Sequence, residues 1–249
     1  LTAVALFLAA LWCGGRFELP TIDERWGEAA RADIPLQSYE IEGLRSIKCY
    51  GSSKAFAARM QRIEGVCGVR TFVRRHAVEV TYDPSRTAPE RILEAIFTPV
   101  TAQFFAPAAD VARLDCWQLG VEGLHDRTDI ALFEHQLRLL GGVCGFESEF
   151  ACPVRVTLYA LPSAGLTEER LGEVIEARET VLRGPGGEQR AAPGFRLAEC
   201  VRLGEVPRGK FLARMFDEAS RLSGPFSLNS ARWGDDRLHP KALYEVPFP

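Results

Sequence analysis

Apolar and polar residues alternate in a regular order along the first half of the chain. The stretch "LQSYEIEG" (residues 36–43) has the period of two that is typical of a β-strand. Apolar residues then recur at helical spacing over residues 52–65 and again over residues 87–96. Between these two helices, "VRTFV" and "AVEVTY" alternate on either side of a polar turn, and this pattern predicts a β-hairpin.

Each predicted helix begins with residues that favour a helix N-terminus. Ser52 and Ser53 are candidate N-cap residues of the first helix. Thr87 precedes the second helix and is followed by Pro89, a combination typical of a capped start. With a last strand at "VTAQFF", the order becomes strand, helix, strand, strand, helix, strand. This order predicts a ferredoxin-like βαββαβ domain of the α+β class, with two helices on one face of an antiparallel sheet.

The same pattern returns in the second half of the chain. "EGL" at Glu42 recurs at Glu122, and "GVCG" at Gly65 recurs at Gly142. Such self-similarity indicates a repeated structural unit. In the second copy we expect two helices and three further strands, in the ranges 128–140, 167–180, 144–150, 154–159 and 195–203. We therefore expect two tandem ferredoxin-like domains, the first over residues 36–107 and the second over residues 113–203.

Three segments lie outside these two copies. Residues 1–15, "LTAVALFLAALWCGG", are uncharged and almost wholly apolar, which indicates either a membrane anchor or the core of a signal peptide. We therefore expect a membrane-anchored or exported protein, with the side of the membrane open. Residues 16–35 read as a polar linker with one short helix around 23–32, and residues 204–249 as a helix followed by an aromatic tail.

Charge and motif content narrow the functional classes. The 249 residues carry a net charge of -3 with a pI near 5.9, which gives no general electrostatic reason to bind nucleic acid. The chain contains no Gly-x-Ser-x-Gly, no phosphate-binding loop, no His-Glu-x-x-His and no dinucleotide fingerprint after a strand. We therefore predict a protein that is not an enzyme, with no evident small-molecule substrate.

The seven cysteines do not form a disulfide framework, because their number is odd and their spacing is irregular. No Cys-x-x-Cys pair occurs. Buried thiols behave as small hydrophobic side chains. We interpret four of them in this way: Cys67, Cys116, Cys144 and Cys200.

The two copies resemble the heavy-metal-associated domain family, which includes copper chaperones and the N-terminal modules of copper-transporting P-type ATPases. That family has Gly-Met-x-Cys-x-x-Cys after the first strand, then a helix, a Gly-Val pair and a hairpin that ends in an aromatic residue and Asp. Counted back from Gly65, the two family cysteines fall on Cys49 and Ser52. The hairpin positions of the first copy also match, at Val78, Val80, Tyr82 and Asp83. In the second copy the two cysteine positions fall on Asp126 and Asp129.

The resemblance implies a site for a soft cation at the start of the first helix. Copper(I) is held by two deprotonated thiols, and the helix dipole favours a thiolate there. Ser52 replaces one of these sulfur atoms. Cys67 cannot replace it, because a helix of about twelve residues, hence ~18 Å, separates it from Cys49. Cys49 is thus either a thiol that needs a ligand from elsewhere or a relic of the family site.

The second copy offers a harder set of ligands. His125, Asp126 and Asp129 surround the expected helix start, where carboxylates can bind zinc or magnesium weakly. Asp is also common there as a cap and as a partner of the helix dipole. Both interpretations of Asp126 and Asp129 stay open, with capping favoured.

Two functional hypotheses follow. In the first, the chain is a membrane-tethered protein that binds copper(I) or zinc and hands it to a metal transporter or metalloprotein. In the second, the ferredoxin-like scaffold remains, the metal site is lost, and the chain is a protein–protein interaction module that uses its sheet edges or its aromatic tail.

Overall fold

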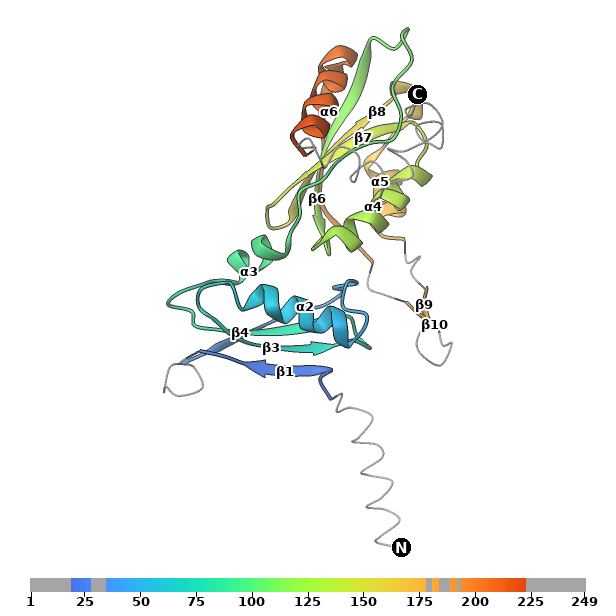
Figure 1. The fold of residues 1–249 in the computed structure, drawn as a ribbon. Coiled ribbons are helices and arrows are strands. Elements are labelled where there is room, and N and C mark those ends of the chain that lie inside the picture. The colour runs from blue at the N-terminus through green and yellow to red at the C-terminus, as the bar shows by residue number, and fades with distance from the viewer. Residues whose placement is uncertain (1–18, 28–34, 178–180, 184–188, 192–193, 223–249) are drawn as a thin grey trace, which may run out of the picture. The chain divides into compact units, whose positions relative to one another are not determined.

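The computed structural model describes residues 19–27, 35–177, 181–183, 189–191 and 194–222 (Figure 1). These residues form two larger antiparallel sheets, one two-stranded hairpin and five α-helices, so the chain belongs to the α+β class. The chain divides into two compact units, one ending at Ile96 and the other beginning at Phe97. The small hairpin, β9 (Val181–Arg183) and β10 (Gln189–Ala191), is grouped with the first unit.

The first unit has a four-stranded antiparallel sheet with the strand order β1-β3-β4-β2. Its elements in chain order are β1 (Ile22–Arg25), β2 (Gln37–Ile41), α2 (Tyr50–Met60), β3 (Val66–Phe72), β4 (Ala77–Tyr82) and α3 (Pro89–Ile96). Strands, helices and hairpin all lie where the hydrophobic pattern predicts them, with the exception of β1.

Alternation along the strands places the core of the first unit on one face of its sheet. Val78 and Val80 of β4 are fully buried and pack in the same cluster as Phe56 of α2 and Ile92 of α3. Each such side chain contributes roughly 1.5–3 kcal/mol when it leaves water. The opposite face of this sheet is polar, and Arg70 and Glu79 form an ion pair across it.

Two expectations for the first unit are wrong. A short helix was expected from Asp23 onwards, but Ile22–Arg25 is the strand β1, which pairs with β3. Residues 28–34 of that expected helix lie outside the described residues. The strand expected at "VTAQFF" exists as β5 (Thr101–Gln103), but it pairs with a strand of the second unit and does not close the first sheet.

The second unit has a five-stranded antiparallel sheet with the order β11-β6-β8-β7-β5. After β5, its elements are β6 (Arg113–Glu122), α4 (Arg127–Leu139), β7 (Val143–Glu149), β8 (Val154–Ala160), a 3-10 turn η2 (Pro162–Ala164), α5 (Glu168–Ile175), β11 (Arg196–Pro207) and α6 (Arg208–Leu222). Helix α5 ends sooner than the sequence predicts, and the hairpin β9–β10 lies between α5 and β11 in the sequence.

Helices cover both faces of this second sheet, as Figure 1 shows. On one face, Phe133 of α4 meets Phe146 and Phe195 edge to face, with ring centroids 5.8 and 5.5 Å apart. On the other face, Phe211 and Met215 of α6 are buried in a separate cluster with residues of β6, β7 and β8. The predicted C-terminal amphipathic helix is therefore a structural part of the second unit.

The repeated "GVCG" has the same backbone geometry in both units. Its first glycine has a positive φ, +84° at Gly65 and +71° at Gly142, which favours glycine. The pairing with the following strand slips at the cysteine in both copies, as in a β-bulge. Its last glycine lies against the backbone of the preceding edge strand. A Cβ on Gly68 would lie 2.9 Å from the Glu24 carbonyl oxygen, and a Cβ on Gly145 would lie 2.5 Å from that of Ala102.

Gly145→Ala should therefore destabilise the protein by about 1–3 kcal/mol, because the added methyl group forces β5 away from β7. The matched control is Gly172→Ala within α5, where an added Cβ meets nothing within 4 Å and alanine favours the helix by about 1 kcal/mol. Urea unfolding of both variants measures the difference. Equal stability of the two variants would show that the close approach of β5 and β7 is not formed.

Candidate functional site at the helix starts

The start of α2 brings Cys49 and Ser52 together. Cys49 has an extended backbone and is the N-cap residue, so the cap lies three residues before the predicted cap Ser52. The Ser52 hydroxyl oxygen accepts hydrogen bonds from the backbone N–H groups of Lys48 (2.9 Å) and Cys49 (3.0 Å). The same hydroxyl donates to the Cys49 carbonyl oxygen at 2.9 Å. Ser53, the other predicted cap, is buried, and its hydroxyl oxygen has no hydrogen-bond partner.

The Cys49 thiol is exposed, and its surroundings stabilise the thiolate form. Hydrogen bonds from the Ser52 backbone N–H, the Ser52 side chain and the Gly51 backbone N–H lower the pKa of Cys49 below its ordinary value. A lower pKa gives a larger thiolate fraction at neutral pH, and the thiolate is the form that ligates metals and attacks electrophiles.

No second thiol lies beside Cys49 among the described residues. Cys67 lies on β3, beyond the far end of the eleven-residue helix α2, which corresponds to about 16 Å of helix. Burial and the nearby Asp83 charge raise the pKa of Cys67, so it stays protonated at neutral pH. Within the described ranges, no group of three or more His, Cys, Asp or Glu side chains is arranged to hold a metal ion.

At the start of α4, both aspartates act as capping groups. Asp126 is the N-cap, and its carboxylate accepts hydrogen bonds from the backbone N–H groups of Thr128 (2.8 Å) and Asp129 (3.4 Å). The fully buried Asp129 carboxylate accepts from the His125 N–H at 3.2 Å and lies 3.2 Å from His125 Nδ1. These contacts favour the capping interpretation over a zinc or magnesium site.

The two helix starts are built in the same way. Cys49 and Asp126 are both N-caps, and Ser52 and Asp129 are both the third residue of their helix. In each copy the third side chain accepts a hydrogen bond from the residue before the cap, Lys48 or His125. This bond ties the residue just before each cap to the first turn of the helix.

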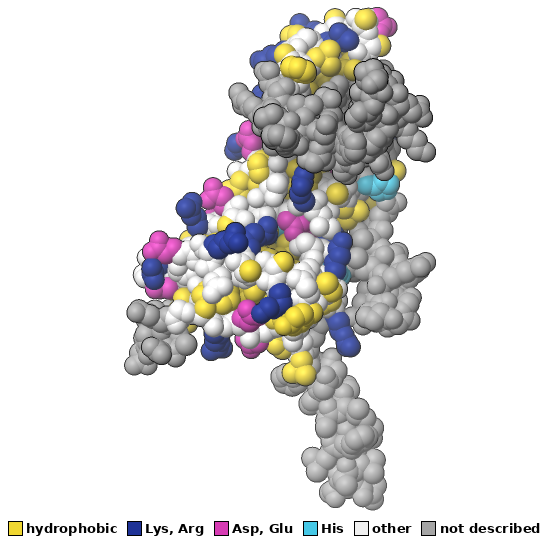
Figure 2. All heavy atoms as spheres, in the orientation of Figure 1, with side chains coloured by type: hydrophobic (Ala, Val, Ile, Leu, Met, Phe, Trp, Pro, Cys, Tyr) yellow, Lys and Arg dark blue, Asp and Glu magenta, His cyan; other side chains and the backbone are white. Residues whose placement is uncertain are grey.

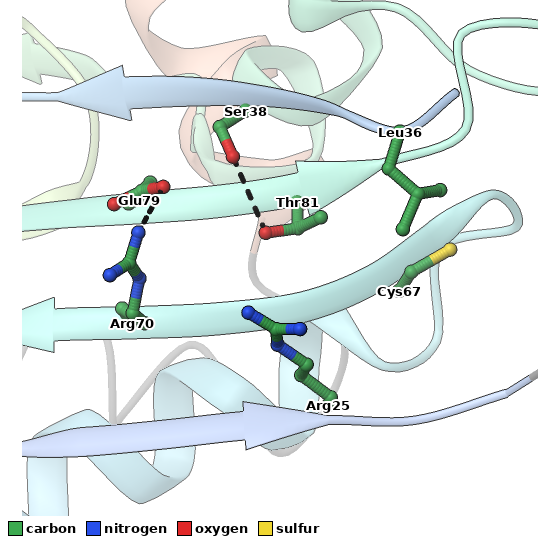
Figure 3. A pocket seen from close by; sticks show the side chains of 7 residues that line it. All are labelled: Arg25, Leu36, Ser38, Cys67, Arg70, Glu79 and Thr81. Atoms are coloured by element: carbon green, nitrogen blue, oxygen red, sulfur yellow. Dashed lines mark hydrogen bonds and ion pairs between the residues drawn. The ribbon is translucent and has the colours of Figure 1, made fainter. Parts of the chain in front are cut away.

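One face of the first sheet, which no helix of the described residues covers, carries a shallow hollow of about 200 Å³ that the sequence does not predict (Figure 3). Arg70 pairs with Glu79 across it at 2.6 Å, and the Ser38 and Thr81 hydroxyl groups face each other at 3.5 Å. The remaining residues around the hollow are Arg25, Leu36 and Cys67. The hydrogen bond that Arg70 donates to the Glu79 carboxylate raises the pKa of Arg70, and burial lowers this pKa by a smaller amount.

The positions of the second sheet that correspond to this hollow lie under α6. Strand pairing gives the correspondence: Ser38 pairs with Thr81 in the first sheet. Cys116 pairs with Tyr159 in the second. Cys116 and Tyr159 are buried with Phe211 of α6. The Tyr159 hydroxyl donates to Glu147 at 2.8 Å, and Arg214 of α6 pairs with the same carboxylate at 2.6 Å. The sheet face that no described helix covers in the first unit is thus covered by α6 in the second.

The prediction that four cysteines are buried as small hydrophobic side chains is confirmed for Cys116 and Cys144. Burial raises the pKa of Cys144 to about 11 and that of the half-buried Cys200 also to about 11. Cys67 is half-buried as well. None of these four cysteines is fully exposed, in contrast to the Cys49 thiol at the start of α2.

Charges of both signs are interspersed on the visible surface (Figure 2). Several are paired across the first unit, as in Lys54–Glu24 at 2.5 Å and Arg75–Glu40 at 2.9 Å.

None of the helices in the described ranges has the length and apolar character needed to cross a bilayer. The apolar residues 1–15 lie outside those ranges.

Comparison with known proteins gives no relative of this chain: neither the family models, nor the curated proteins, nor the solved structures contain a match.

Ser52→Ala should raise the pKa of Cys49, because the variant loses the serine hydroxyl that helps to stabilise the thiolate. The pH midpoint of Cys49 alkylation, followed by mass spectrometry of the peptide that contains it, should therefore move upwards. Ser53→Ala is the matched control, since that hydroxyl has no hydrogen-bond partner and should leave the midpoint unchanged. A midpoint that Ser52→Ala does not move would contradict this account of the helix start.

Proposed function

We propose that the two units are degenerate copies of a ferredoxin-like domain of the heavy-metal-associated type, and that the protein is a non-enzymatic protein–protein interaction module. The strand order of the second unit supports the scaffold part of the proposal. Without β5, the strands of this unit in chain order are β6, β7, β8 and β11. The first and third of them, β6 and β8, are neighbours in the sheet, and β7 and β11 flank this central pair. A split βαβ unit produces this arrangement. The equivalent construction of the two helix starts supports a common origin of both copies.

One observation carries the functional part of the proposal. At three of the four positions that the resemblance assigns to metal ligands, the side chain offers an oxygen atom in place of the family sulfur, and this oxygen is hydrogen-bonded to the start of its own helix. Ser52, Asp126 and Asp129 all accept backbone N–H groups there. A ligand that must first leave its capping position weakens both the helix start and the metal complex, since a cap contributes about 1 kcal/mol.

The interaction hypothesis fits the surfaces that the units leave accessible. The first sheet has a polar face that no helix of the described residues covers. The terminal strands of both sheets have an outer side on which none of the described strands pairs. Such edges recognise extended segments through backbone hydrogen bonds. The apolar residues 1–15 would tether the module to a membrane and so place its partner there.

A second candidate function rests on Cys49 itself. Its thiol is exposed and its pKa is lowered, as expected of a ligand that is completed by a cysteine or histidine of another protein. In this hypothesis the chain would hold copper(I) or zinc through a single thiolate and pass it to a transporter or metalloprotein.

Metal titration of the full chain separates the two functions. Copper(I) and zinc would each be added against a competing chelator, to the unmodified chain, to Cys49→Ser and to Cys152→Ser, which removes the other exposed cysteine of the described residues. The interaction proposal predicts no stoichiometric complex in any of the three proteins. A one-to-one complex that Cys49→Ser abolishes and Cys152→Ser retains would overturn it in favour of metal handover.

The variant Ser52→Cys tests the scaffold separately, because it restores two thiols at the family spacing on the start of α2. A copper(I) complex that appears only in this variant would support the family assignment together with the loss of the natural site.

A further inference from the structure

The outer edge of β2 distinguishes the first unit from the second. In the first sheet β2 is a terminal strand, and no strand of the described residues pairs with its outer side. In the second sheet the equivalent strand is β6, whose outer edge pairs antiparallel with β11 from Arg113 to Glu122. The first unit therefore presents an edge whose counterpart in the same chain accepts an antiparallel strand.

The other terminal strands of the two sheets carry features that discourage further pairing. Strand β1 has four residues, and three of them, Asp23, Glu24 and Arg25, are charged. Strand β5 has three residues, and the pairing of β11 is interrupted by two register shifts. Strand β2, by contrast, has five residues in unbroken register with β4, without proline or lysine, and carries the single charged residue Glu40.

We propose that this edge pairs with β2 of a second copy of the chain, antiparallel and about a two-fold axis. The two four-stranded sheets would then form one continuous sheet of eight strands. A two-fold interface uses the same surface on both partners, so the pairing closes as a dimer and does not extend into a fibre.

The sequence of β2, "QSYEI", complements itself in this arrangement. With the axis at Tyr39, all five residues are paired, and Ser38 lies opposite Glu40 of the partner subunit on the polar face. Gln37 lies opposite Ile41 of the partner subunit on the helix-covered face. No charge meets a like charge, whereas an axis at Glu40 would place the two Glu40 carboxylates opposite each other, which is unfavourable.

The test uses the full chain in a mild detergent, with its mass followed by sedimentation over a range of concentrations. The unmodified chain should dimerise. Ser38→Glu places a carboxylate opposite Glu40 of the partner subunit twice per dimer and should raise the dissociation constant roughly fivefold to thirtyfold. Ser38→Lys, the matched variant at the same exposed position, should leave the constant unchanged or lower it.

Circular dichroism and thermal midpoints establish that both variants are folded. A single-chain mass at every concentration would overturn the proposal. A dimer whose dissociation constant responds equally to glutamate and lysine at position 38 would overturn it as well, because such a dimer would be held elsewhere, for example through residues 1–15.

Discussion

A strand segment can pair within only one sheet at a time, and Thr101–Gln103, which follows the last helix of the first unit, pairs in the second sheet. Glycine at position 145 lets the Ala102 carbonyl approach the backbone of β7 more closely than any side chain would allow. The Ser148 N–H donates to the Val100 carbonyl oxygen at 2.8 Å, and the Ser148 hydroxyl oxygen accepts from the Val100 N–H at 2.9 Å. These contacts hold β5 in the second sheet. Strand β5 therefore does not pair with the outer edge of β2 in the first sheet.

The close approach of an edge strand to a glycine also explains why "GVCG" occurs in both halves of the chain. Each copy is preceded by an edge strand, β1 or β5, which lies against the last glycine of "GVCG". The cysteine of that motif occupies a bulge in both sheets, half-buried at position 67 and buried at position 144. The first and last glycines of the motif are thus required by the backbone. The helix starts follow a similar rule, because both keep an oxygen at the third helical position that caps the backbone.

The hydrophobic pattern predicts most of the local structure. The spacing of Phe56 and Met60 predicts α2, and the alternation in "AVEVTY" predicts β4, because both periods follow directly from burial on one face. Strand β1 is missed because "IDER" is a short, charged edge strand whose conformation depends on its partner. The partner of β5 is missed for a related reason: alternation identifies a strand, but it does not identify the sheet that the strand joins.

The candidate site is predictable in part. Counting from Gly65 correctly predicts that Cys49 and Ser52 adjoin each other at a helix start, since their spacing is a single helical turn. Sequence alone does not show that the Ser52 oxygen is hydrogen-bonded to the backbone, or that Asp129 is fully buried, because both depend on where the helix begins. The hollow on the first sheet and the covering of its counterpart by α6 arise from tertiary packing and leave no local pattern.

The pairing of residues 101–103 is the central claim, and nuclear Overhauser effects in a deuterated, selectively labelled full chain measure it directly. The account predicts cross-strand effects between Ala102 and Phe146, which face each other in the β5–β7 ladder. Cross-strand effects between residues 101–103 and Gln37–Ile41 would contradict it, because they would place this segment at the outer edge of β2.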